Sequence, residues 1–357
     1  MYFPNTIWSV SFLVIVFVEA AVVLAFEGYV FGKFEANINA NIDSAQRRDS
    51  NTVAIPTYLA LFIFGEIYQL VLAWDALRLK NTIQVIGLCL FNTAVLVYAG
   101  IQFEQIKQAA SLLSVMRLDD ASDGYVLGSS AWGDMKPFLI AIIGVIGVAG
   151  FVMAYICFQL YREFGWTIYK QIGADLRMKH RYLAYQIFMT LLKFDVFFFL
   201  GFTIQFVVIV LNRKDVEFAL TIAVIPLTIV VLVITTMSVR RESYVGMVSM
   251  IVIFFAGMAY FLFKLVRMFQ PAQAYKYVAA RKSLTVFAAI TLFLILVTII
   301  NAIVCTANFR KGLKPYVYKA ARPSWLTTTH EKRYGGHDEI TSTETTSPVV
   351  RRRMSID

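Results

Sequence analysis

The sequence has little charge. Of its 357 residues, 16% are Asp, Glu, Lys or Arg, whereas 59% are hydrophobic, and the mean hydropathy is +0.66. Soluble domains carry roughly a quarter charged residues. This shortage excludes an ordinary soluble domain, and it predicts a protein whose solvent is lipid.

Cysteine is scarce as well, and the common catalytic motifs are missing. Cys89, Cys157 and Cys305 each lie inside an apolar run, so they cannot form a disulfide framework. The sequence contains no HExxH, GxSxG, Walker or CxxC motif, and its three histidines offer no metal site. We therefore predict that the protein is not an enzyme and that it uses neither a cofactor nor a metal.

Glycine and proline are absent from residues 175–200, within the stretch around which the chain is organised. A helix over residues 181–211 would be roughly 45 Å long, whereas the hydrocarbon layer of a membrane is about 30 Å thick. Basic residues crowd its first part, and no ionisable side chain follows Asp195 before Arg213. The first half is therefore expected at the cytosolic interface, and the second half is expected to span the membrane.

Eight apolar runs are long enough to cross a membrane as helices. They cover residues 7–26, 55–77, 82–103, 137–160, 183–211, 217–237, 244–263 and 284–305. Helices satisfy their own backbone hydrogen bonds in lipid, and the runs lack the alternation of barrel strands. The predicted fold is an all-α polytopic transmembrane bundle of about eight spans. A seven-span version stays open, in which run 55–77 does not cross and the N-terminus lies outside.

The domain organisation follows from these runs. Residues 1–309 are expected to form the bundle, which includes a basic cytosolic connector at 161–182. A basic juxtamembrane segment follows at 310–322, and residues 323–357 have the polar composition of a disordered cytosolic tail. The distribution of Lys and Arg favours cytosolic termini only weakly.

Basic residues give the chain a net charge of +10, and they flank the apolar runs. Anionic lipid headgroups are therefore the expected partner, and nucleic acid is not. The membrane-surface basic residues are Lys170, Arg177, Lys179, Arg181, Arg310 and Lys311. In the tail, Ser347 precedes a proline and Ser355 follows three arginines, as phosphorylation sites often do. Chance matches in a solvated tail are the favoured interpretation of these two serines.

Several polar residues interrupt the apolar runs. The candidate intramembrane polar site consists of Glu19, Glu66, Gln69, Asn92, Lys193 and Asp195. Glu19 and Glu66 lie near the middle of their runs, where an ionised carboxylate is costly unless it is protonated, paired or in contact with water. Such acids could carry protons or cations in a transporter. A neutral acid that makes one interhelical hydrogen bond is the favoured alternative.

Lys193 and Asp195 look like an ion pair but cannot form one within a helix. Residues two apart point about 200° away from each other. Both side chains are expected to extend to the interface, with contacts to neighbouring helices as the alternative. Glu27 and Lys264, at the ends of their runs, are expected to extend to the interface in the same way.

Two long strings resemble a known family. QIGADLRMKHRYLAYQIFMTLLKFDVFFFLGFTIQF at 171–206 and FGEIYQLVLAWDALRLKNTIQV at 64–85 resemble an uncharacterised family of fungal multi-pass membrane proteins of the Golgi apparatus. The resemblance covers roughly residues 4–318, omits the tail, and implies an endomembrane location without supplying catalytic or ligand-binding residues. We expect a transport or trafficking role, with a seven-span receptor-like sensor as the alternative.

Overall fold

A computed structural model describes residues 6–41, 50–118, 127–172, 175–210, 216–270 and 281–311, all of which belong to one compact unit. The predicted tail, with Ser347 and Ser355, lies outside the described residues, as does the juxtamembrane segment beyond Lys311.

The described residues form long helices and contain no strand. The elements are α1 (Ile7–Asn41), α2 (Ser50–Arg78), α3 (Thr82–Leu118), α4 (Leu127–Ile172), α5 (Leu176–Gln205), the short π-helix η2 (Phe206–Val210), α6 (Val216–Arg241), α7 (Tyr244–Met268) and α8 (Arg281–Ala307). Within the described ranges, eight helices are long and apolar enough to cross a membrane, and α2 is one of them. The predicted all-α bundle of eight spans is confirmed.

Several helices extend beyond the apolar runs that predicted them. α1 continues past residue 26 to Asn41, and α4 begins at Leu127 and ends at Ile172. Hydropathy identifies only the part of a helix that lies in lipid. Once a helix has formed, adding further residues costs little free energy, so the helix continues into polar sequence. The connector 161–182 is therefore divided between the end of α4 and the start of α5. Asp175 caps α5 by accepting hydrogen bonds from the backbone N–H groups of Arg177 and Met178.

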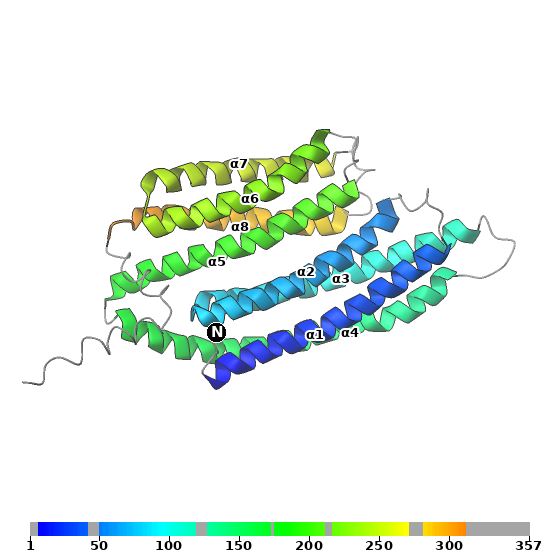
Figure 1. Cartoon of the computed structure of the whole chain (residues 1–357), viewed down its shortest axis with the longest axis horizontal. Helices are drawn as coiled ribbons and strands as arrows, with labels where there is room; N and C mark the ends of the chain where they lie inside the picture. Colours follow the sequence, from blue (N-terminus) through cyan, green and yellow to red (C-terminus); the bar gives the residue numbers. More distant parts are fainter. Residues whose placement is uncertain are drawn as a thin grey trace, which may run out of the picture. The chain divides into compact units, whose positions relative to one another are not determined.

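The helices form two groups. In the first group, α1 and α3 each pack against α2 and α4. In the second group, α5 and α7 each pack against α6 and α8. The groups meet through their inner helices, because α2 and α3 contact α5 and α3 also contacts α8 (Figure 1).

Aromatic rings fill much of this meeting surface. The ring of Phe197 on α5 lies 4.8 Å from that of Phe91 on α3 and 5.5 Å from that of Phe64 on α2, measured between centroids. Glycine is needed at two close approaches. A Cβ atom at Gly87 would lie 2.5 Å from the Phe194 ring, and one at Gly201 would lie 2.5 Å from the Phe287 ring. Small residues thus allow helices to pack closely around large rings.

Candidate functional site

Glu19 lies at the centre of the first helix group. Its buried carboxyl accepts a hydrogen bond from Gln69 Nε2 on α2 at 3.3 Å and another from Asn92 Nδ2 on α3 at 2.5 Å. The same Asn92 nitrogen also lies 3.3 Å from Met153 Sδ on α4. The structure therefore brings together three of the predicted polar residues, from three helices.

Glu66 lies one helical turn from Gln69 on α2, and only 1% of its surface is exposed. Neither carboxyl oxygen has a hydrogen-bond partner among the described residues. Its carboxyl lies within electrostatic range of Glu19 and Glu27 on α1. An ionised carboxylate in such surroundings is costly, so Glu66 must be neutral here or must meet water or a cation.

Glu27 was expected at the membrane interface, and this expectation is wrong. The side chain is buried because α1 continues well beyond it. Gln102 Nε2 on α3 donates to both Glu27 oxygens, at 3.0 and 3.2 Å. The spacing could have revealed this role, because residues eight apart share one face of a helix and lie about 12 Å apart along it. Glu27 and Glu19 therefore form two levels of one polar stripe.

We call this set of residues the carboxyl stripe: Glu19, Glu27, Glu66, Gln69, Asn92 and Gln102. The amide nitrogens donate to the carboxyl oxygens, while the amide oxygens of Gln69 and Gln102 have no partner among the described residues. Among the residues that the structure describes, no group of three or more Asp, Glu, His or Cys side chains is placed to hold a metal ion. Carboxyls paired with amides can bind and release protons, which is the chemistry that this arrangement fits best.

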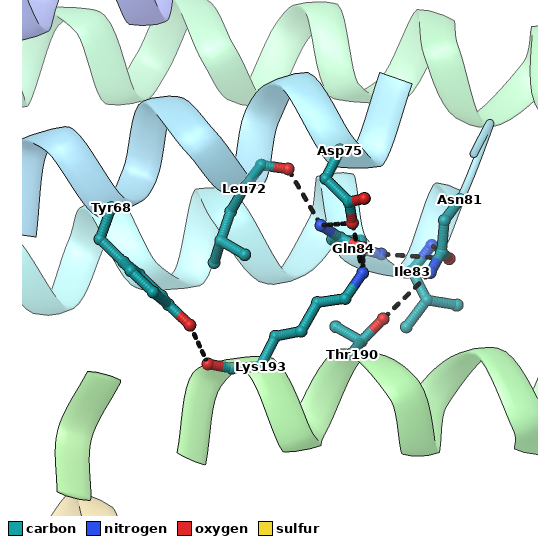
Figure 2. Close-up of polar contacts among 8 residues, drawn as sticks. All are labelled: Tyr68, Leu72, Asp75, Asn81, Ile83, Gln84, Thr190 and Lys193. Carbon is teal, nitrogen blue, oxygen red and sulfur yellow. Dashed lines mark hydrogen bonds and ion pairs between the residues drawn. The ribbon is translucent and has the colours of Figure 1, made fainter. Parts of the chain in front are cut away.

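Lys193 reaches away from the carboxyl stripe and joins the two helix groups. Its ammonium group on α5 forms an ion pair with Asp75 at the end of α2 and donates to Gln84 Oε1 on α3 at 2.7 Å (Figure 2). Gln84 Nε2 in turn donates to Asp75 Oδ2 at 3.1 Å and to the carbonyl of Leu72 at 2.9 Å. We call Lys193, Asp75 and Gln84 the Lys193 clasp.

Two further contacts flank the Lys193 clasp. Asn81 Nδ2, in the turn between α2 and α3, donates to Thr190 Oγ1 at 3.2 Å, and the Tyr68 hydroxyl donates to the Lys193 carbonyl at 2.6 Å (Figure 2). Sequence reasoning did not include Asp75 or Gln84 in the site. Asp75 and Gln84 flank the short join between the apolar runs 55–77 and 82–103, and this position was the available indication that both lie at one depth.

Asp195 faces the other way and does not join Lys193. Its buried carboxyl accepts a hydrogen bond from Thr298 Oγ1 on α8 at 2.7 Å, and its second oxygen has no partner among the described residues. Asp195 therefore does not extend to the interface as expected, because α5 begins at Leu176 and carries it deep into the bundle. Lys264 is also buried, with its ammonium 4.2 Å from the centroid of the Phe206 ring, because α7 continues to Met268.

The predicted surface basic residues lie near the ends of helices. Arg177 and Lys179 are exposed in the first turn of α5. Arg181 Nη1 donates to the Lys311 carbonyl at 2.8 Å, so the start of α5 contacts the segment that follows α8. The side chain of Lys170, near the end of α4, lies outside the described residues.

Comparison with known proteins gives one extensive match. A UPF0658 Golgi apparatus membrane protein of Schizosaccharomyces pombe is 36% identical to the chain over 329 residues, which cover 88% of this chain and 90% of that protein. No family model and no solved structure matches. The sequence-based recognition is confirmed: this chain, with its membrane-length helices, belongs to the UPF0658 family of multi-pass Golgi apparatus membrane proteins.

Proposed function

We propose that this protein moves protons across the Golgi membrane as part of a transport cycle, with the carboxyl stripe as the path. No covalent chemistry on a substrate is involved. The observation that carries the proposal is Glu66, a buried carboxyl with no hydrogen-bond donor among the described residues.

A purely structural role accounts poorly for Glu66. Buried polar groups are normally hydrogen-bonded, and interhelical hydrogen bonding is the usual structural reason for a polar residue in a membrane span. Glu19 and Glu27 fit that role, because amide groups donate to both. Glu66 has no such partner, yet it lies within electrostatic range of both acids. A carboxyl that alternately receives and releases a proton fits this position better.

The neighbouring amides suit alternating protonation. Each amide nitrogen stabilises an ionised carboxylate by donating to it, and each amide oxygen can accept a hydrogen bond from a protonated one. The unpaired oxygens of Gln69 and Gln102 are available for the second arrangement. The carboxyl stripe can therefore stabilise its acids in both protonation states by small side-chain rotations.

The receptor-like alternative is less well supported. It assumed seven spans, whereas eight helices of the described ranges are long and apolar enough to cross. A trafficking role, in which the bundle serves as an anchor, would not require Glu66 to change its protonation state. The decisive measurement is therefore proton movement.

The test uses Golgi vesicles from cells in which the resident protein is replaced by a variant. After the vesicle proton pump is stopped, we expect the lumenal pH to recover much more slowly with Glu66→Gln than with the natural protein, at equal protein level and Golgi retention. Asp195→Asn is the matched control, because it changes a buried acid outside the carboxyl stripe and should leave the rate unchanged. The proposal would be wrong if a variant with both Glu19→Gln and Glu66→Gln let the lumenal pH recover at the rate of the natural protein.

A further inference from the structure

Three segments that are distant in sequence meet at one end of the second helix group. Arg181 near the start of α5 donates to the carbonyl of Lys311, which follows α8. The backbone N–H of Arg310 donates to Glu242 Oε2, in the turn between α6 and α7, at 3.0 Å. The guanidinium of Arg310 also lies 5.3 Å from the centroid of the Tyr244 ring, at the start of α7. These contacts make one continuous surface from the three segments.

This surface is strongly basic. We call it the basic corner, and its basic residues are Arg177, Lys179, Arg181, Arg240, Arg241, Arg310 and Lys311. Its described acids, Glu242 and Asp175, accept hydrogen bonds from backbone N–H groups, since Glu242 accepts from Arg310 and Asp175 caps α5. Seven basic residues therefore face two acids among the described residues of the corner, which leaves it with an excess of positive charge.

Exposed apolar residues lie next to these charges. Val245, in the first turn of α7, is 80% exposed, and Leu176, the first residue of α5, is 68% exposed. At the membrane interface such apolar side chains insert at the boundary between headgroups and acyl chains, while the neighbouring basic groups contact the headgroups. Charge and apolar surface together match a lipid better than a soluble anion.

Arginine predominates in the basic corner, and this favours phosphate. A guanidinium offers five N–H donors in a planar fork that matches phosphate oxygens, and Arg181 uses one of them for the bond to Lys311. We propose that the basic corner binds the phosphate headgroup of an anionic membrane lipid, with Arg181, Arg240, Arg241 and Arg310 as its ligands. This site is separate from the carboxyl stripe and does not depend on proton transport.

The test is a binding titration of the full chain in neutral detergent, followed by native mass spectrometry, with phosphatidic acid as the probe and phosphatidylcholine as the neutral reference. A variant with Arg181, Arg240, Arg241 and Arg310 all changed to Gln should bind phosphatidic acid at least a hundredfold more weakly, because each basic residue contributes about fivefold. The matched control removes the same charge at the opposite helix ends, by changing Lys107, Arg267, Arg281 and Lys282 to Gln. It should bind within about twofold of the natural chain.

Three outcomes would overturn the proposal. Equal losses in both variants would mean that diffuse charge attracts the lipid, and natural affinity in the first variant would mean that the basic corner is not the site. Displacement of the lipid by an equal concentration of inorganic phosphate would assign the corner to a soluble anion. Since four changes could disturb folding, Arg310→Gln alone must also weaken binding about fivefold at an unchanged melting temperature.

Discussion

The Lys193 clasp allows a quantitative prediction that does not depend on the proposed function. Lys193→Met keeps most of the side-chain stem but removes the charge that pairs with Asp75 and the donor to Gln84. Asp75→Asn removes the other charge. We expect each variant to lower the free energy of unfolding, and we expect the double variant to lose less than the sum of the two.

The size of the effect follows from the partial burial of the pair. Breaking a buried ion pair costs about 3–5 kcal/mol, whereas an exposed pair contributes about 0–1 kcal/mol. The side chains of Lys193 and Asp75 are 24% and 33% exposed, so an intermediate cost of about 2 kcal/mol for each single change is expected. Asp75 also keeps its bond from Gln84, which limits the loss in Lys193→Met. The interaction energy should be about 1–2 kcal/mol.

The assay is denaturant unfolding in mixed micelles for the natural chain, both single variants and the double variant. Arg177→Met is the control for loss of an exposed charge on the same helix, and its effect should stay within about 0.5 kcal/mol. The argument is refuted if the two single losses sum to the loss of the double variant within about 0.5 kcal/mol, because Lys193 and Asp75 would then not stabilise each other.

Two further predictions concern topology and the carboxyl stripe. Tags at both termini should be cleaved when protease is added outside sealed vesicles, and a tag within residues 104–136 should be protected, whereas protection of the N-terminal tag alone would contradict the eight-span arrangement. Gln102→Leu should lower the free energy of unfolding in micelles by about 1–3 kcal/mol, because it leaves Glu27 without its donor. Adding Glu27→Leu should recover part of that loss, and a further loss of similar size would show that the pairing does not matter.

The spans could be predicted from the sequence, but the packing of their faces could not. A helix in water shows its buried face as an apolar stripe, whereas a helix in lipid is apolar all round. On α1, Val16 is 1% exposed and Val14 is 51% exposed, although the two residues are identical. Hydropathy therefore identified the lipid-crossing segments and gave no information about which valine meets α2 or α4.

The polar residues could be found in the sequence one at a time, but their partners could not. Lys193 and Asp75 are separated by 118 positions, and they meet only because α5 packs against the hairpin of α2 and α3. Glu27 was misplaced for a related reason, since its apolar run ends at residue 26 while its helix does not. Partner choice depends on helix neighbours, which a single sequence does not specify.

α2 contributes residues to both the carboxyl stripe and the Lys193 clasp. It carries Glu66 and Gln69 toward α1, and it carries Tyr68 and Asp75 toward α5. Glu66 and Asp75 are nine residues apart, or about 14 Å along a helix, so they belong to one rigid element. A rigid-body shift of α2 would therefore move Glu66 and Asp75 together, and with them the contacts that this helix makes to α1 and to α5.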